Sequence, residues 1–185
     1  MNSNPTRPGS DNQLLIHTLT PSLRSPLLSM VRRIADCGCS LVDVRVATLG
    51  ADASVALLAQ GPWDAIAKLE SALGKFARDG DLHLSWYRTA PRGPQGHLLP
   101  YMVEVIAADK PGILVEVIDF FSRRGISVEQ LSSMRYHAMQ TGAEMFSAQI
   151  TIGIPADSHI ASLRDDFMEL CDGLNLDAIM DPMKF

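Results

Sequence analysis

The chain has 185 residues, of which 46% are hydrophobic and 20% charged, and its formal net charge is −5. This composition is typical of a globular protein. The lack of any run of about 18 apolar residues excludes a transmembrane helix. The first residues lack the basic and apolar regions of a secretory signal. The negative charge lies in the second half, since residues 1–97 carry a formal charge of +2 and residues 98–185 one of −7, and an acidic chain without a basic cluster is a poor partner for nucleic acid.

Residues 13–89 are predicted to form one compact α+β unit. The polar residues 1–12 before it are expected to be a disordered tail. Apolar runs of strand length lie at 14–19, 40–47, 54–59 and 82–86. Between them, from Leu27 to Ile34 and from Ile66 to Phe76, apolar residues recur at the spacing of one helix face. The predicted order is strand–helix–strand–strand–helix–strand.

Residues 101–185 repeat this pattern after a linker at 90–100 that contains three prolines and two glycines. In the second copy the apolar runs of strand length lie at 101–106, 127–134, 145–152 and 176–180. The offset between the copies is 87 residues at first and grows to 94 after a longer turn, which contains residues 136–142 of the second copy. Gly38 and Gly125 then occupy equivalent helix ends, where a left-handed cap is expected. Pro62 and Pro155 are expected near helix starts.

The pattern predicts an α+β fold of two ferredoxin-like βαββαβ units in tandem. Each unit would form an antiparallel four-stranded sheet with both helices on one face. The uncovered face and edge of each sheet need a partner. Pairing of the two sheets edge to edge, which we favour, and packing face to face both remain open.

The segment Asp109-Lys110-Pro111-Gly112 joins the first strand of the second copy to its first helix. Free backbone N–H groups of residues 112–114 at the helix start favour a carboxylate, and Asp109 can accept hydrogen bonds from an ammonium group. The turn therefore suits a small amino acid held at both ends. A structural alternative is that Asp109 caps the helix.

No motif for nucleophilic catalysis, phosphate binding or dinucleotide binding is present, so we predict no enzymatic activity. The five histidines and three cysteines lack metal-ligand spacing, and we expect no metal and no cofactor. Cys37, Cys39 and Cys171 are predicted to be reduced and buried. His17 and Glu104 occupy equivalent places in the two first strands and are expected on an outer face.

The second copy resembles an ACT domain, a small regulatory module of amino-acid metabolism. The resemblance lies in Asp109-Lys110-Pro111-Gly112 followed one helix later by Gly125-Ile126-Ser127-Val128. The first copy adds motifs of tandem-ACT repressors of the glycine cleavage operon over a resemblance that spans residues 13 to 181: Cys37-Gly38-Cys39-Ser40, Asp43-Val44-Arg45, Leu49-Gly50 and Gly61-Pro62-Trp63-Asp64-Ala65-Ile66.

This resemblance implies a cytoplasmic negative regulator of transcription that senses a small amino acid, with glycine favoured. It implies action through a transcriptional activator protein, without direct binding to DNA or to a membrane, and it leaves a homodimer open. The ligand site that it implies is the turn and helix start of the second copy, with two residues from the next strand across a module interface: Asp109, Pro111, Gly112, Ile113, Leu114, Ser127 and Glu129.

The first copy departs from this pattern. Where the second copy has its Asp–Lys–Pro–Gly turn, the first has Ser22-Leu23-Arg24-Ser25 followed by Pro26. We expect that the ligand site is lost there, although a different ligand or packing on the second copy would also explain the change. The alternative function is a regulatory subunit or interaction module for an enzyme of amino-acid or one-carbon metabolism.

Overall fold

The computed structural model describes residues 12–21, 25–79, 82–93 and 98–183. The chain divides into two compact units, Met1–Gly93 and Pro94–Phe185. Residues 1–11 of the predicted tail, residues 94–97 in the middle of the predicted linker, and residues 22–24 lie outside the described residues.

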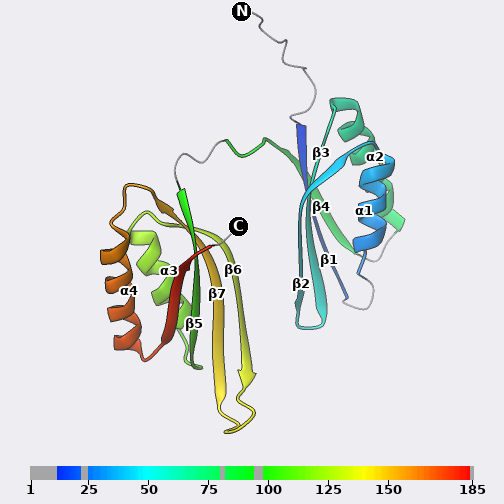
Figure 1. Ribbon diagram of the computed structural model, residues 1–185. Helices are drawn as coiled ribbons and strands as arrows, with labels where there is room; N and C mark the ends of the chain where they lie inside the picture. The colour runs from blue at the N-terminus through cyan, green and yellow to red at the C-terminus, as the bar shows by residue number, and fades with distance from the viewer. Residues whose placement is uncertain (1–11, 22–24, 80–81, 94–97, 184–185) are drawn as a thin grey trace, which may run out of the picture. The chain divides into compact units, whose positions relative to one another are not determined.

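Unit 1 is a four-stranded antiparallel sheet with two helices. The strand order is β2-β3-β1-β4, and both helices lie on the same face of the sheet (Figure 1). Its elements are β1 (Asn12–Pro21), α1 (Leu27–Asp36), β2 (Ser40–Leu49), β3 (Asp52–Gly61), α2 (Trp63–Asp79) and β4 (His83–Thr89).

Unit 2 repeats this architecture. Its strand order is β6-β7-β5-β8, which matches that of unit 1 position by position. Its elements are β5 (Leu98–Ala108), α3 (Ile113–Arg123), β6 (Ser127–His137), β7 (Glu144–Pro155), α4 (Ile160–Leu174) and β8 (Asp177–Pro182). The predicted α+β class and the tandem βαββαβ arrangement are therefore confirmed.

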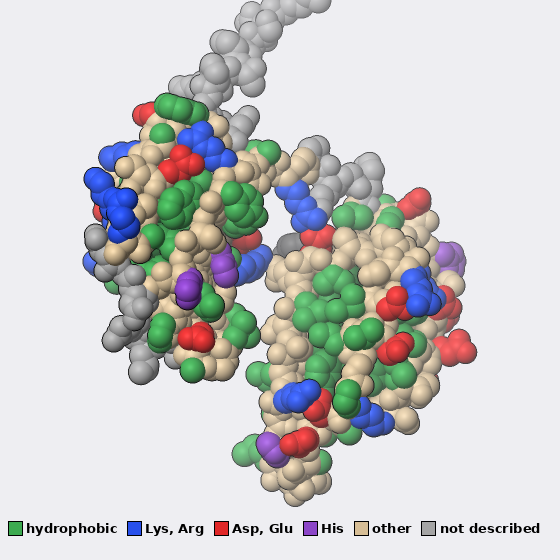
Figure 2. All heavy atoms as spheres, turned by 180° about the vertical axis from the view of Figure 1, so that it is seen from behind, with side chains coloured by type: hydrophobic (Ala, Val, Ile, Leu, Met, Phe, Trp, Pro, Cys, Tyr) green, Lys and Arg blue, Asp and Glu red, His purple; other side chains and the backbone are tan. Residues whose placement is uncertain are grey.

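Each sheet has a helix face, which packs against its two helices, and an open face on the other side. Side chains alternate between the two faces along a strand. In β3, for example, Val55, Leu57 and Ala59 are fully buried on the helix face. Hydrophobic side chains also occur on the molecular surface (Figure 2). On the face of unit 2 that is shown, Lys and Arg side chains lie beside Asp and Glu side chains.

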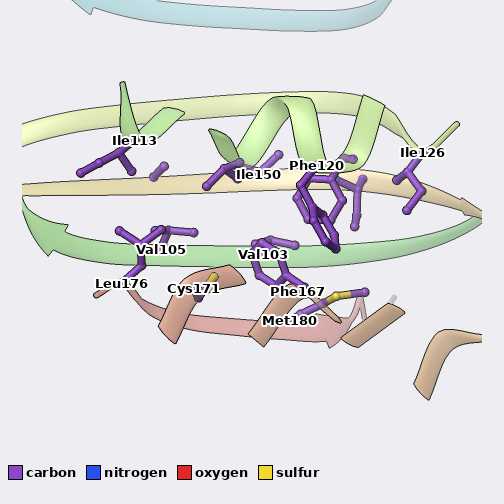
Figure 3. Close-up of a cluster of buried hydrophobic side chains, with 14 of the residues drawn as sticks. Val103, Val105, Ile113, Phe120, Ile126, Ile150, Phe167, Cys171, Leu176 and Met180 are labelled. Atoms are coloured by element: carbon purple, nitrogen blue, oxygen red, sulfur yellow. The ribbon is translucent and has the colours of Figure 1, made fainter. Parts of the chain in front are cut away.

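The core of unit 2 is built around three aromatic rings. Phe120 and Phe121 of α3 meet Phe167 of α4, with ring centroids 5.1 to 5.3 Å apart. Val103 and Val105 of β5 close the core from the sheet (Figure 3). The core of unit 1 has no such aromatic cluster among its buried residues and relies on aliphatic side chains and two cysteines.

The strand registers confirm the offset found in the sequence. His17 lies opposite Ala56 and Ser85, and Glu104, 87 residues later, lies opposite Gln149 and Ile179. Gly38 and Gly125 have φ values of 81° and 68°, which confirms the predicted left-handed helix ends.

The equivalent edge strands β2 and β6 each carry a β-bulge at the same position. The register of β2 shifts between Leu41 and Asp43, and that of β6 shifts between Val128 and Gln130. The extra residues, Val42 and Glu129, are again 87 apart. Each bulge reverses the alternation of side chains beyond it.

Several element ends differ from the predictions. Asn12, expected in the tail, begins β1, and β5 begins at Leu98, inside the expected linker. Strand β6 continues past Met134 to His137. Pro155 ends β7 and does not lie at the start of α4; His159 caps that helix, and its Nδ1 accepts a hydrogen bond from the Ser162 N–H at 3.2 Å.

Candidate functional site

The turn between β5 and α3 is held at both ends by backbone hydrogen bonds. The Asp109 N–H donates to the Glu144 carbonyl at 3.0 Å, which continues the pairing of β5 with β7. The Glu116 N–H donates to the Gly112 carbonyl at 3.2 Å and forms the first turn of α3. The turn therefore presents a fixed backbone between a sheet end and a helix start.

Gly112 is the N-cap residue of α3 and has a left-handed backbone, with φ of 92°. Apart from Gly112 itself and its two chain neighbours, no heavy atom lies within 4 Å of the place where a Cβ would stand. The glycine is thus required by the backbone conformation, and the space beside it is open to a small molecule. Lys110 and Pro111 are exposed on the same turn.

Asp109 does not cap α3, because the structure gives that helix no side-chain cap. The alternative prediction of a capping role was wrong. The carboxylate instead forms an ion pair across the unit, with Asp109 Oδ2 at 3.1 Å from Nε of Arg135 in β6. The side chain of Asp109 is only 12% exposed, whereas that of Arg135 is 74% exposed.

Arg135 was not among the predicted site residues, because the apolar run that predicted this strand ends at Met134. In the structure Arg135 lies in β6 opposite Phe146, a core residue of β7. That register places its side chain on the helix face of the sheet, where the turn at Asp109 begins. The β-bulge in β6 sets the face on which Arg135 lies, and the sequence pattern of one strand does not show a bulge.

Ile113 and Leu114 contribute to the turn in different ways. Ile113 is buried in the core, so that it offers its backbone and not its side chain to a ligand. Leu114 is half-buried and lines a shallow, mainly apolar hollow on α3 together with Val115, Ile118, Asp119 and Ser122.

Ser127 and Glu129 lie at the opposite end of unit 2 from Asp109. Ser127 pairs with Gly153, nine residues along β7 from Glu144, a separation of about 30 Å. The Ser127 hydroxyl donates to Glu129 Oε1 at 2.6 Å. In Figure 3, Ile113 at the start of α3 and Ile126, which follows its end, lie at opposite ends of the core. Within this unit the structure does not bring these two residues to the turn.

The equivalent turn of unit 1 is only partly described. Ser22, Leu23 and Arg24 lie outside the described residues. Helix α1 has Pro26 as its N-cap residue, and the Ser29 hydroxyl donates to the Pro26 carbonyl at 2.8 Å.

His17 and Glu104 each have a partner in their own sheet. A nitrogen of His17 lies 2.9 Å from the Ser54 hydroxyl, and the Gln149 amide donates to Glu104 at 3.0 Å. Both residues are on the open face, as expected.

All three cysteines are buried and unpaired, as predicted. Burial raises the pKa of Cys171 to about 11, and the charge of Asp172 adds to the effect. Among the described residues no group of three His, Cys, Asp or Glu could hold a metal ion, and no described helix combines the length and apolar character that a membrane crossing requires.

Comparison with known proteins finds similar sequences and similar folds. Residues 18–87 match the model of the ACT domain. The chain is 28% identical over 166 residues to the glycine cleavage system transcriptional repressors of Escherichia coli (strain K12) and of Shigella flexneri, an alignment that covers 90% of this chain and 87% of each relative.

Two solved structures share the fold over nearly the whole chain. A crystal structure of a proposed glycine cleavage system transcriptional repressor has a TM-score of 0.70 at 23% identity and covers 95% of this chain and 99% of its own. An unknown protein from Galdieria sulphuraria has a TM-score of 0.74 at 15% identity, covering 94% and 99%. Residues 18–87 thus resemble an ACT domain, and the chain as a whole, with its two βαββαβ units, is similar to the glycine cleavage system transcriptional repressor.

Proposed function

We propose that the protein is an amino-acid-sensing regulator of transcription that binds a small amino acid, with glycine favoured, at the Asp109 turn of unit 2. Similarity to the glycine cleavage system transcriptional repressors supports the regulatory role. The observation that carries the ligand site is the open space at left-handed Gly112, next to a largely buried carboxylate and the start of α3.

The chemistry of the turn suits the two ends of an amino acid. The ammonium group is held by Asp109, and the carboxylate lies against the backbone N–H groups that begin α3. An anion is favoured at such a helix start because several N–H groups there have no partner within the helix.

We propose further that the protein represses by binding an activator protein of the glycine cleavage operon and does not bind DNA itself. Unit 2 belongs to the half of the chain with a formal charge of −7. In Figure 2 its basic side chains lie beside acidic ones and do not gather into a basic patch on that face. Affinity for a phosphate backbone depends on such a patch.

Titration calorimetry with glycine, serine and larger amino acids tests the ligand site. We expect saturable binding of glycine that Asp109→Asn abolishes. The matched control is Asp119→Asn, which removes a carboxylate that pairs with Arg123 on α3 at 2.7 Å and lies outside the turn. Equal binding by the wild type and Asp109→Asn would refute the site.

The partner is tested separately. Co-purification from cells should recover a transcriptional activator, and a gel-shift assay at physiological salt should show no binding of DNA by the protein alone. Recovery of an enzyme of amino-acid or one-carbon metabolism instead would favour the role of a regulatory subunit.

A further inference from the structure

The ion pair at the turn of unit 2 is strongly asymmetric. Asp109 is held in place by its backbone hydrogen bond to Glu144, and its carboxylate is largely buried. Arg135 reaches this carboxylate through a single close contact and leaves most of its guanidinium in water. Because the Arg135 side chain lies mostly in water, it loses little when it leaves Asp109, whereas the largely buried Asp109 carboxylate then needs another cation.

The repeat links the two charges to each other. At the 87-residue offset, Asp109 corresponds to Ser22 and Arg135 to Thr48. The second equivalence is structural as well, because Thr48 and Arg135 follow equivalent bulges and lie opposite Ala53 and Phe146. The first copy thus lacks both partners of the ion pair: Ser22 stands in place of Asp109, and Thr48 stands in place of Arg135.

We propose that Arg135 is a specificity-determining residue of the ligand site, which recognises the carboxylate of a zwitterionic amino acid by exchanging partners. This inference rests on the proposed binding of an amino acid at Asp109. In the unliganded protein Arg135 neutralises Asp109. When the ligand binds, its ammonium replaces the guanidinium on Asp109, and the released guanidinium pairs with the ligand's carboxylate.

This exchange selects for ligands that carry both charges. One ion pair is broken and two are formed when the ligand is zwitterionic, so the total charge is balanced at every stage. A ligand with an ammonium but no carboxylate must displace Arg135 from Asp109 and provides no new anionic partner for the guanidinium. For that ligand Arg135 is a competitor, whereas for an amino acid it is a binding group.

Calorimetric titration of glycine and of glycinamide, in which an amide replaces the carboxylate, tests the proposal in the full-length protein. We expect Arg135→Gln to weaken glycine binding about ten-fold, as loss of a charged hydrogen bond does, and to leave glycinamide binding unchanged or tighter. Arg135→Lys should recover part of the affinity for glycine. The control is Arg123→Gln, which removes the same charge from the exposed end of α3 and should change neither titration.

The outcomes separate this proposal from the proposed function. If the wild type binds glycine but Arg135→Gln affects both ligands equally, or tightens the binding of glycine, the role of Arg135 is refuted and the site stands. If the wild type binds no amino acid, both proposals fail. Thermal unfolding of each variant checks that the fold is intact, which is expected because Arg135 is exposed.

Discussion

Arg88 of β4 and Glu70 of α2 form a two-pronged ion pair that ties the last strand of unit 1 to its longer helix. The Nε atom of Arg88 lies 2.9 Å from one carboxylate oxygen and Nη2 lies 2.8 Å from the other. This geometry gives stronger hydrogen bonds than a single contact. The pair lowers the pKa of Glu70 below its usual 4.5, chiefly through the hydrogen bond from Arg88.

The Glu70–Arg88 pair makes the stability of unit 1 dependent on pH. We expect Glu70→Gln to lower the free energy of unfolding by about 0.5–1 kcal/mol at pH 7, since both side chains remain partly exposed. Because the pKa of Glu70 is lower in the folded state, the contribution is complete above about pH 4.5 and disappears as the pH falls through the folded pKa. Urea unfolding of both proteins between pH 3 and pH 7 should show this difference shrink as the pH falls; a constant difference would contradict the assignment.

The aromatic cluster predicts where unit 2 is most sensitive to truncation. Phe167 is fully buried and touches two other rings, so Phe167→Ala should lower the free energy of unfolding by about 3–5 kcal/mol. Leu28→Ala on α1, at a side chain that is 62% exposed, should change it little. Chemical denaturation followed by circular dichroism measures both, and a small effect at Phe167 would refute the packing described.

Two glycines should respond to alanine with opposite signs. Gly112→Ala should destabilise unit 2 by about 1 kcal/mol, because its φ of 92° is costly for any residue with a Cβ. Gly173 lies within α4, and no heavy atom approaches within 4 Å of its Cβ position. Gly173→Ala should therefore stabilise the unit by about 0.5–1 kcal/mol, and differential scanning calorimetry distinguishes the two signs.

The buried cysteines should be unreactive while the protein is folded. With its pKa at about 11, Cys171 carries almost no thiolate at neutral pH, and the pKa of Cys39 is also raised by burial. Native and urea-unfolded protein are treated with iodoacetamide at pH 7.5 and analysed by mass spectrometry. We expect no modification of Cys39 or Cys171 in the native protein and modification of all three cysteines in urea. Rapid labelling of Cys171 in the native protein would show that unit 2 opens locally.

The sequence predicted the elements well because both copies bury one face of every helix and strand. The stripe from Leu27 to Ile34 and the glycine at Gly38 mark α1 from local information alone, and the second copy repeats both signals. Local patterns also place Asp109 and Gly112 in one turn. They do not show what the Asp109 carboxylate contacts, because its partner, Arg135, is 26 residues away and reaches it only through the pairing of three strands.

The bulge at Glu129 explains why this partner lies within reach. Ser127 shares the open face with Gly153, so an uninterrupted strand would send every odd-numbered side chain of β6 to that face, Arg135 included. The additional residue reverses the parity and turns Arg135 toward the helices. Deleting Glu129 should therefore place the Arg135 side chain on the open face of the sheet. Asp109 would then lose its counter-ion, even though neither Asp109 nor Arg135 is altered. The same irregularity at Val42 keeps Thr48 of unit 1 in the corresponding orientation, so the two units share this backbone position and differ in whether a charged or an uncharged side chain occupies it.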